Sequence, residues 1–203
     1  MIALETTIIE QSLLTSFNYN EYRETIKNLL KKDLSTGPTQ SEDLLNFSLL
    51  NDKRMDRLDK KLIVFEEFKE EFKNLSKKYT LLVIAEGWCG DAAQTLPILN
   101  KIAETSENIN LKIVLRDENE DLMNMFLTNG SKSIPKVIIL NEDNNVLNTW
   151  GPRPQIATQM VTDYKAKHGV IDAEFKKNLQ VWYNKDKGFN TQREILELLK
   201  RNF

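Results

Sequence analysis

The chain reads LLVIAEGWCGDAA at residues 81–93, an apolar run that leads into a glycine-containing segment around the single cysteine. Every residue from Leu81 to Ala85 is apolar, which is typical of a short strand buried on both faces of a sheet. Helical spacing resumes at about Asp91 and extends to about Glu104. Cys89 is therefore predicted to lie between a buried strand and the first turn of a helix.

The residues on both sides of this stretch alternate between helical and strand periodicity. Phenylalanines 65, 68 and 72 share one helical face before the strand. The elements predicted after the central helix are a strand at 111–115, a helix at 118–127, strands at 137–140 and 146–150, and a helix at 155–167. Parallel strands joined by helices and finished by a hairpin predict an α/β fold, with a mixed central sheet that carries helices on both faces.

The outer parts of the chain are predicted to be helical. Asn18, with Glu21 three residues later, opens a helix that extends to about Lys32, and a further helix starts near Ser41. Near the C-terminus a helix is predicted from Asp172 to Asn184. The last helix is predicted to open with a capping box at 191–194, which reads Thr-Gln-Arg-Glu.

The position of Cys89 predicts a chemically active thiol. The amide groups and dipole at a helix N-terminus stabilise an anion by about 0.3–1 kcal/mol, and by up to about 2 kcal/mol in favourable geometry. This stabilisation would lower the thiol pKa by roughly one unit. Asp91 carries a like charge and raises the pKa. We therefore expect a moderately activated thiol.

The segment from Trp88 to Ala92 resembles the Trp-Cys-Gly-x-Cys motif of the thioredoxin superfamily, with Ala92 in place of the second cysteine. Pro97 stands where thioredoxins kink the active-site helix, and Ser133-Ile134-Pro135 resembles their cis-proline loop. Gly151 matches the glycine that lines their substrate groove. More narrowly, the motif is similar to that of bacterial thioredoxin family proteins with helical extensions.

The resemblance implies a thioredoxin-like domain at 62–168, an N-terminal helical extension at 1–61 and a C-terminal helical extension at 169–203 that packs on the domain. It implies that Cys89 is the catalytic residue. The residues implied to form the substrate groove are Trp88, Gly90, Asp91, Ile134, Pro135, Trp150 and Gly151.

Two departures from the family pattern bear on mechanism. A dithiol enzyme releases its substrate with a second cysteine, which Ala92 cannot provide. The buried acid that thioredoxins carry beneath the motif corresponds here to apolar Val83. We therefore expect a monothiol thiol–disulfide oxidoreductase whose mixed disulfide is resolved by an external thiol. Glutathione or another low-molecular-weight thiol would be the co-substrate, and no bound cofactor is expected.

Two other functions remain open from the sequence. The fold could serve as a non-catalytic protein-binding module in which Cys89 does not turn over. A one-cysteine peroxidase ranks lower, because no threonine stands two or three residues before the cysteine.

Arg116 and Arg153 are candidates for anion recognition, because a guanidinium holds a carboxylate through two hydrogen bonds. The competing interpretation is that both arginines pair with nearby carboxylates of the chain. Acidic residues at 117, 118, 120 and 121 are explained by the first turn of a helix, so no metal site is predicted.

The composition limits the classes of partner and compartment. The chain has 203 residues, 28 basic and 30 acidic side chains, and a net charge of -2, so nucleic acid is not an expected partner. Its apolar runs are shorter than the roughly 20 residues that span a bilayer. A lone cysteine cannot form a bridge within the chain and suits a reducing compartment. We expect a cytoplasmic monomer or weak dimer whose partner is a disulfide-containing protein or a small thiol.

Overall fold

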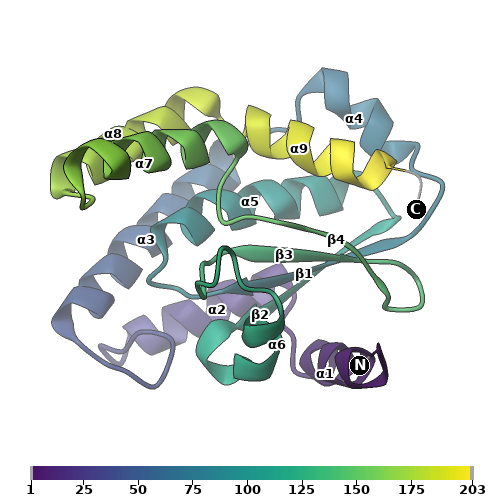
Figure 1. Ribbon diagram of the computed structural model, residues 1–203, viewed down its shortest axis with the longest axis horizontal. Helices are drawn as coiled ribbons and strands as arrows, with labels where there is room; N and C mark the ends of the chain where they lie inside the picture. Colours follow the sequence, from purple (N-terminus) through teal and green to yellow (C-terminus); the bar gives the residue numbers. More distant parts are fainter. Residues whose placement is uncertain (1, 202–203) are drawn as a thin grey trace.

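Four strands form one mixed sheet in the order β2–β1–β3–β4 in the computed structural model, which describes residues 2–201 (Figure 1). β1 (Tyr79–Ala85) is parallel to β2 (Ile109–Leu115) and antiparallel to β3 (Lys136–Leu140). β3 in turn pairs antiparallel with β4 (Val146–Trp150). The predicted α/β fold with a mixed central sheet and a terminal hairpin is confirmed.

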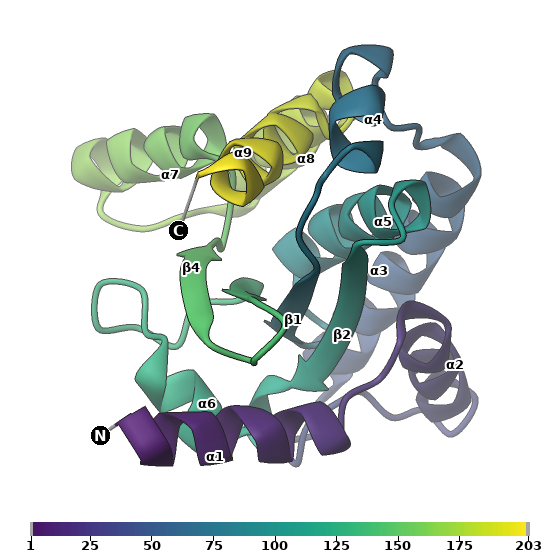
Figure 2. The same cartoon turned by 90° about the vertical axis from the view of Figure 1, so that its right-hand side faces the viewer.

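The helices cover both faces of this sheet. They are α1 (Ile2–Leu14), α2 (Tyr19–Leu30), α3 (Glu42–Lys61), α4 (Glu66–Lys73), α5 (Gly90–Thr105), α6 (Glu120–Met125), α7 (Gln155–His168), α8 (Ala173–Asp186) and α9 (Phe189–Lys200). Figures 1 and 2 agree that α4, α5 and α9 lie on one side of the sheet, whereas α1 and α6 lie on the other. A 3₁₀ turn, η1 (Arg116–Glu118), precedes α6, so the helix predicted at 118–127 is shorter and begins after a break at Asn119.

The apolar core joins the sheet to helices from both ends of the chain. Tyr22 and Met55, from α2 and α3, are buried in the same cluster as the residues of β1, and so are Ile195 and Leu199 from α9. The α7–α8 pair has a separate small cluster, formed by Ala157, Val161, Phe175, Leu179 and Tyr183. The buried apolar residues of α8 belong to this second cluster, so α8 packs mainly against α7.

Two of the predicted helix starts are capped by the side chains expected from the sequence, and a third is not. Asn18 and Glu21 form the predicted capping box at α2, and the Ser41 hydroxyl accepts a hydrogen bond from the Leu44 amide at the start of α3. The capping box predicted at Thr191 is wrong, because α9 begins at Phe189. Lys187 and Gly188 both have left-handed backbone angles (φ +52° and +85°), and this sharp turn puts the N-cap of α9 at Gly188 instead of Thr191. The Thr191 side chain is then buried within the helix.

A buried arginine fixes α3 in place. The Arg23 guanidinium from α2 forms ion pairs with Asp52, Asp56 and Asp59 on α3, at 2.6–2.8 Å. Burying a charge is unfavourable unless it is paired, so these contacts specify one arrangement of the two helices. None of the helices in residues 2–201 is both long and apolar enough to cross a membrane.

Candidate functional site

Cys89 occupies the N-cap position of α5, directly after the loop that follows β1. Its Sγ atom accepts a hydrogen bond of 3.5 Å from the Ala92 amide and donates one of 3.3 Å to the carbonyl oxygen of Ile134. The peptide bond between Ile134 and Pro135 is cis. Cys89 therefore meets the Ile134–Pro135 loop, which lies 45 residues away in the sequence.

The Cys89 thiol is buried, with 8% of the residue exposed, and this burial controls its acidity. Burial and the nearby negative charge of Asp91 raise the pKa of Cys89 to about 12, although the backbone amides of Ala92 and Asp91 and the charge of Arg153 act in the opposite direction. The expectation of a moderately activated thiol is thus wrong. The helix N-terminus does favour the thiolate, but the loss of hydration outweighs it.

Asp91 is the acidic side chain of the site and is itself almost fully buried. One carboxylate oxygen pairs with the Arg153 guanidinium at 2.5 Å, and the other accepts a hydrogen bond of 3.0 Å from the Tyr183 hydroxyl on α8. Burial raises the pKa of Asp91, while the Arg153 charge lowers it. The C-terminal helices are thereby tied to the first turn of α5.

The N-terminal part of the chain holds the loop before Cys89. The Gly87 amide donates to the Thr36 hydroxyl and its carbonyl oxygen accepts from the Asn51 side-chain amide, each at 2.9 Å. A Cβ atom at Gly87 would lie 3.3 Å from the side chain of Ile26. The loop is therefore paired through its backbone and closely packed by residues from outside 62–168.

A buried acid lies near the thiol, at a position that the sequence reasoning did not select. Val83 is fully buried in β1, but Glu86, the residue that follows this strand, is also fully buried. Its Oε1 atom accepts a hydrogen bond of 3.0 Å from the Asp117 amide, and burial raises its pKa. The pKa of Tyr22 is raised first by burial and then by the charges of Cys89 and Glu86, so Tyr22 lies close enough to interact with both groups.

Trp88 and Arg116 form a pair beside the thiol. The Arg116 guanidinium carbon lies 4.8 Å from the centre of the Trp88 ring, and its Nε atom pairs with Asp117 at 2.7 Å. Arg153 also has a carboxylate partner, Asp91. Each of the two candidate anion-recognition residues thus has an acidic partner within the chain.

Trp150 and Gly151 pack against the protein rather than facing an open groove. Trp150 is buried, and its ring N–H donates a hydrogen bond of 2.7 Å to Glu194 on α9. Gly151 has a φ of +115°, and a Cβ atom there would lie 2.3 Å from the carbonyl oxygen of Pro135. Only glycine fits against this loop without a backbone shift.

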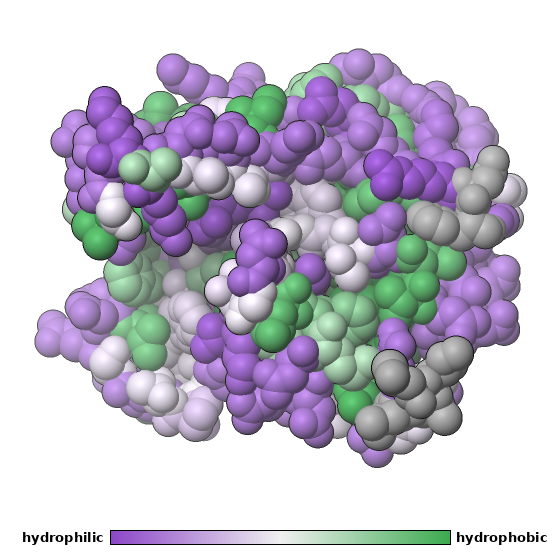
Figure 3. Space-filling view, viewed as in Figure 1, coloured by the Kyte–Doolittle hydropathy of each residue, from purple (hydrophilic) through white to green (hydrophobic). Residues whose placement is uncertain are grey.

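A cavity of about 730 Å³ opens beside Cys89, between α3 and α8. Figure 3 shows hydrophobic surface in the hollow at the left of the molecule, below α7 and α8. The lining residues from the motif are Trp88, Cys89, Gly90 and Asp91, together with Arg153. The residues that the sequence reasoning missed come from the extensions and are Leu44, Phe47, Leu50, Asn51, Ile171, Lys176, Lys177, Leu179 and Gln180, and Arg54 of α3 completes the lining. Ile134, Pro135, Trp150, Gly151 and Arg116 do not line this cavity.

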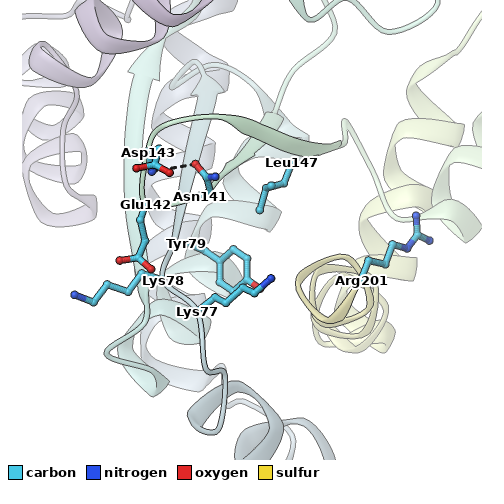
Figure 4. Close-up of a pocket in the computed structure, with 8 residues that line it drawn as sticks. All are labelled: Lys77, Lys78, Tyr79, Asn141, Glu142, Asp143, Leu147 and Arg201. Carbon is cyan, nitrogen blue, oxygen red and sulfur yellow. Dashed lines mark hydrogen bonds between the residues drawn. The ribbon is translucent and has the colours of Figure 1, made fainter. Parts of the chain in front are cut away.

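A smaller depression of about 160 Å³ lies at the opposite end of the sheet, where β1 begins (Figure 4). Tyr79 lines it, but its hydroxyl donates to the Leu199 carbonyl oxygen at 2.9 Å. Glu142 and Lys78 lie at its edge and carry opposite charges. Within residues 2–201 no group of three or more histidine, cysteine or acidic side chains could hold a metal ion.

A protein-family model described as thioredoxin matches residues 37–165, which is more than half of the chain. Among solved structures, a protein of unknown function from Pseudomonas aeruginosa is 19% identical, with a TM-score of 0.59 over 91% of this chain and 98% of that chain. An HIV epitope-scaffold is 18% identical, with a TM-score of 0.57 over 92% of this chain and 100% of that chain. No curated protein matches. At these identities the solved structures show the fold alone.

Proposed function

Because the chain belongs to the thioredoxin family, we propose that it performs monothiol thiol–disulfide exchange with Cys89 as its nucleophile. The observation that carries this proposal is the position of the Cys89 Sγ atom. It caps α5, contacts the carbonyl oxygen before Pro135 and opens onto a cavity large enough for a ligand. The Ile134 carbonyl oxygen would hold the thiol, and Trp88, which lines the cavity, would border the reacting disulfide.

The exchange proceeds in two balanced steps. The Cys89 thiol loses its proton, and the thiolate attacks one sulfur of a substrate disulfide. A bond between Cys89 and that sulfur forms as the substrate S–S bond breaks, and the second substrate sulfur leaves as a thiolate that takes up a proton. Glutathione or another external thiol then attacks the substrate sulfur of the mixed disulfide, which restores Cys89 and forms a new external disulfide.

The resolving thiol must come from outside, because Ala92 occupies the position of the second cysteine and the chain has no other. A mixed disulfide with Cys89 would therefore persist until a small thiol reaches it. The proposed reaction would therefore suit a reducing compartment such as the cytoplasm, where small thiols are available. It needs no bound cofactor and no second copy of the chain.

The resting site is adapted to slow, selective exchange rather than to rapid turnover. With a pKa of about 12, Cys89 is protonated at neutral pH. Only the thiolate attacks, and its higher intrinsic nucleophilicity at high pKa offsets less than half of the lost thiolate fraction on a logarithmic scale. The thiol would therefore react mainly with a disulfide that the neighbouring cavity holds in place.

The burial of the Cys89 thiol also supports a second candidate function, a thioredoxin-fold module that binds a protein without turnover. The two candidates differ in what Cys89 does. In a binding module, Cys89→Ser retains partner binding and the wild type forms no mixed disulfide. In the exchange reaction, the wild type forms the adduct and the variant does not.

A coupled assay with hydroxyethyl disulfide, glutathione and glutathione reductase tests the exchange. We expect turnover above the Cys89→Ser background, and a mixed disulfide detectable by intact-protein mass spectrometry when glutathione is left out. Wild-type turnover equal to that of the variant, together with no adduct, would rule out exchange and leave the binding module.

A further inference from the structure

The cavity beside Cys89 has one predominantly apolar wall. Leu44, Phe47 and Leu50 lie three residues apart on α3, so they share one face of that helix, and Phe47 and Leu50 are 47% and 53% exposed. Ile171 and the buried Leu179 contribute apolar surface from the α8 side. Hydrophobic side chains gathered in one hollow are a typical feature of binding sites.

Cationic side chains surround this apolar surface. Arg54 on α3 and Lys176 and Lys177 on α8 line the cavity, and within residues 2–201 no carboxylate lies within ion-pair distance of any of them. Asp91, the acidic lining residue, already pairs with Arg153. The cavity therefore carries an excess of positive charge, although the whole chain has a net charge of -2.

One cation of the cavity lies close to the thiol. The Arg54 Nη1 atom lies 3.7 Å, and the Gln180 Nε2 atom 3.8 Å, from the position that a Cβ atom would take at Gly90. Leu50, Phe47 and Leu44 follow in successive steps along α3 away from Arg54. Lys176 and Lys177 lie about one helical turn before Gln180 on α8, so positive charge continues along the cavity beside its apolar wall.

We propose that this groove, formed by the lining residues of α3 and α8, binds a polypeptide segment of the substrate that carries both acidic and apolar residues next to its reactive cysteine. Acidic side chains would pair with Arg54, Lys176 and Lys177, and the apolar side chains would cover Phe47 and Leu50. The delivery of a disulfide to Cys89 rests on the proposed function, but the binding itself does not.

The charge of the groove favours a polypeptide over a fatty acid. A fatty acid offers a single carboxylate, whereas Arg54, Lys176 and Lys177 supply three cations along the cavity. A polypeptide can place apolar side chains on this surface and keep its backbone and polar side chains in water. A basic segment would be repelled by the unpaired cations.

Fluorescence anisotropy with the full-length Cys89→Ser variant measures binding without thiol chemistry. The probe is a labelled peptide with glutamates next to a serine in place of its cysteine, followed by leucine and phenylalanine. We expect it to bind more tightly than a peptide with lysines for glutamates, and more tightly than one with serines for the apolar residues. Equal binding of the lysine peptide would overturn the proposal, and so would displacement of the probe by decanoate.

Two matched charge reversals locate the binding. Lys177→Glu should weaken binding of the glutamate peptide by about fivefold, which corresponds to the upper range of an exposed ion pair. Lys185→Glu makes the same change on α8 outside the groove and should leave binding unchanged. Equal effects of the two variants would overturn the proposal. Hydroxyethyl disulfide carries neither acidic nor apolar side chains, so turnover on it tests the exchange independently of peptide binding.

Discussion

The Asn51 side-chain amide donates a hydrogen bond of 2.9 Å to the carbonyl oxygen of Gly87, two residues before Cys89. Asn51 is almost fully buried, and its Oδ1 atom accepts a hydrogen bond from Arg54. A helix far from the motif in sequence thus sets the backbone of the loop before Cys89 and, through the same side chain, the position of a cation in the groove.

Asn51→Ala should therefore loosen the loop. The buried Gly87 carbonyl would lose its partner, and the free energy of unfolding should fall by about 1–3 kcal/mol. Asn46→Ala, on the exposed side of the same helix, should change it by less than about 0.5 kcal/mol. Chemical denaturation measures both values. Alkylation of Cys89 should also be faster in Asn51→Ala, and equal stability of the two variants would show that the contact is unimportant.

The pH dependence of Cys89 alkylation tests the burial of the thiol. Because the pKa of Cys89 is raised to about 12, the rate with iodoacetamide should rise about tenfold per pH unit between pH 7 and 10. A free cysteine, with a pKa of about 8.5, levels off within this range. A plateau below pH 9 would contradict the buried, protonated thiol.

The raised pKa of Cys89 also predicts a change in the free energy of unfolding with pH. Between a pKa of about 8.5 in the unfolded chain and about 12 in the folded protein, the folded protein keeps a proton that the unfolded chain has lost. The thiol's contribution to the free energy of unfolding is therefore constant below pH 8 and falls by about 1.4 kcal/mol per pH unit above 8.5. Because Cys89→Ser removes this titration, the difference between wild type and variant, measured by denaturation at several pH values, isolates it.

The fold was predictable because its signals are local. The apolar run at Leu81–Ala85, the glycines around Cys89 and the capping pair Asn18–Glu21 each act within a few residues. The start of α9 was not predictable from Thr191, because two left-handed residues at 187 and 188 override the capping pattern. Such a conformation is uncommon for a lysine, so the sequence gives little warning of it.

The candidate site was predictable only in part. Trp88, Cys89, Gly90 and Asp91 come from one motif, but Phe47 and Lys177 reach the cavity through helices distant in the chain. The amphipathic patterns around these residues indicate helices, but they do not indicate which part of the chain each helix packs against. The prediction of a lowered pKa for Cys89 failed for the same reason. The dipole of α5 is a local property, whereas burial depends on how the whole chain packs.

Two substitutions around Asp91 should move the acidity of Cys89 in opposite directions. The charge of Asp91 raises the pKa of the thiol and that of Arg153 lowers it, so Asp91→Asn should lower this pKa and Arg153→Gln should raise it. Asparagine keeps an acceptor for the Tyr183 hydroxyl. Thiolate absorbance against pH measures both shifts. Shifts of the same sign would show that altered packing, rather than charge, controls the thiol.

Glu194 should be the residue through which α9 stabilises the end of the sheet. One carboxylate oxygen accepts from the Trp150 ring N–H at 2.7 Å, and the other accepts from the Gln155 amide at 2.8 Å, so one side chain joins β4 to the start of α7. Glu194→Ala leaves the buried ring N–H without its partner and should lower the free energy of unfolding by about 1–3 kcal/mol. Glu197→Ala removes an exposed pair with Arg193 and should cost less than about 1 kcal/mol. Denaturation curves for the two variants that coincide would show that β4 is held by its strand pairing alone.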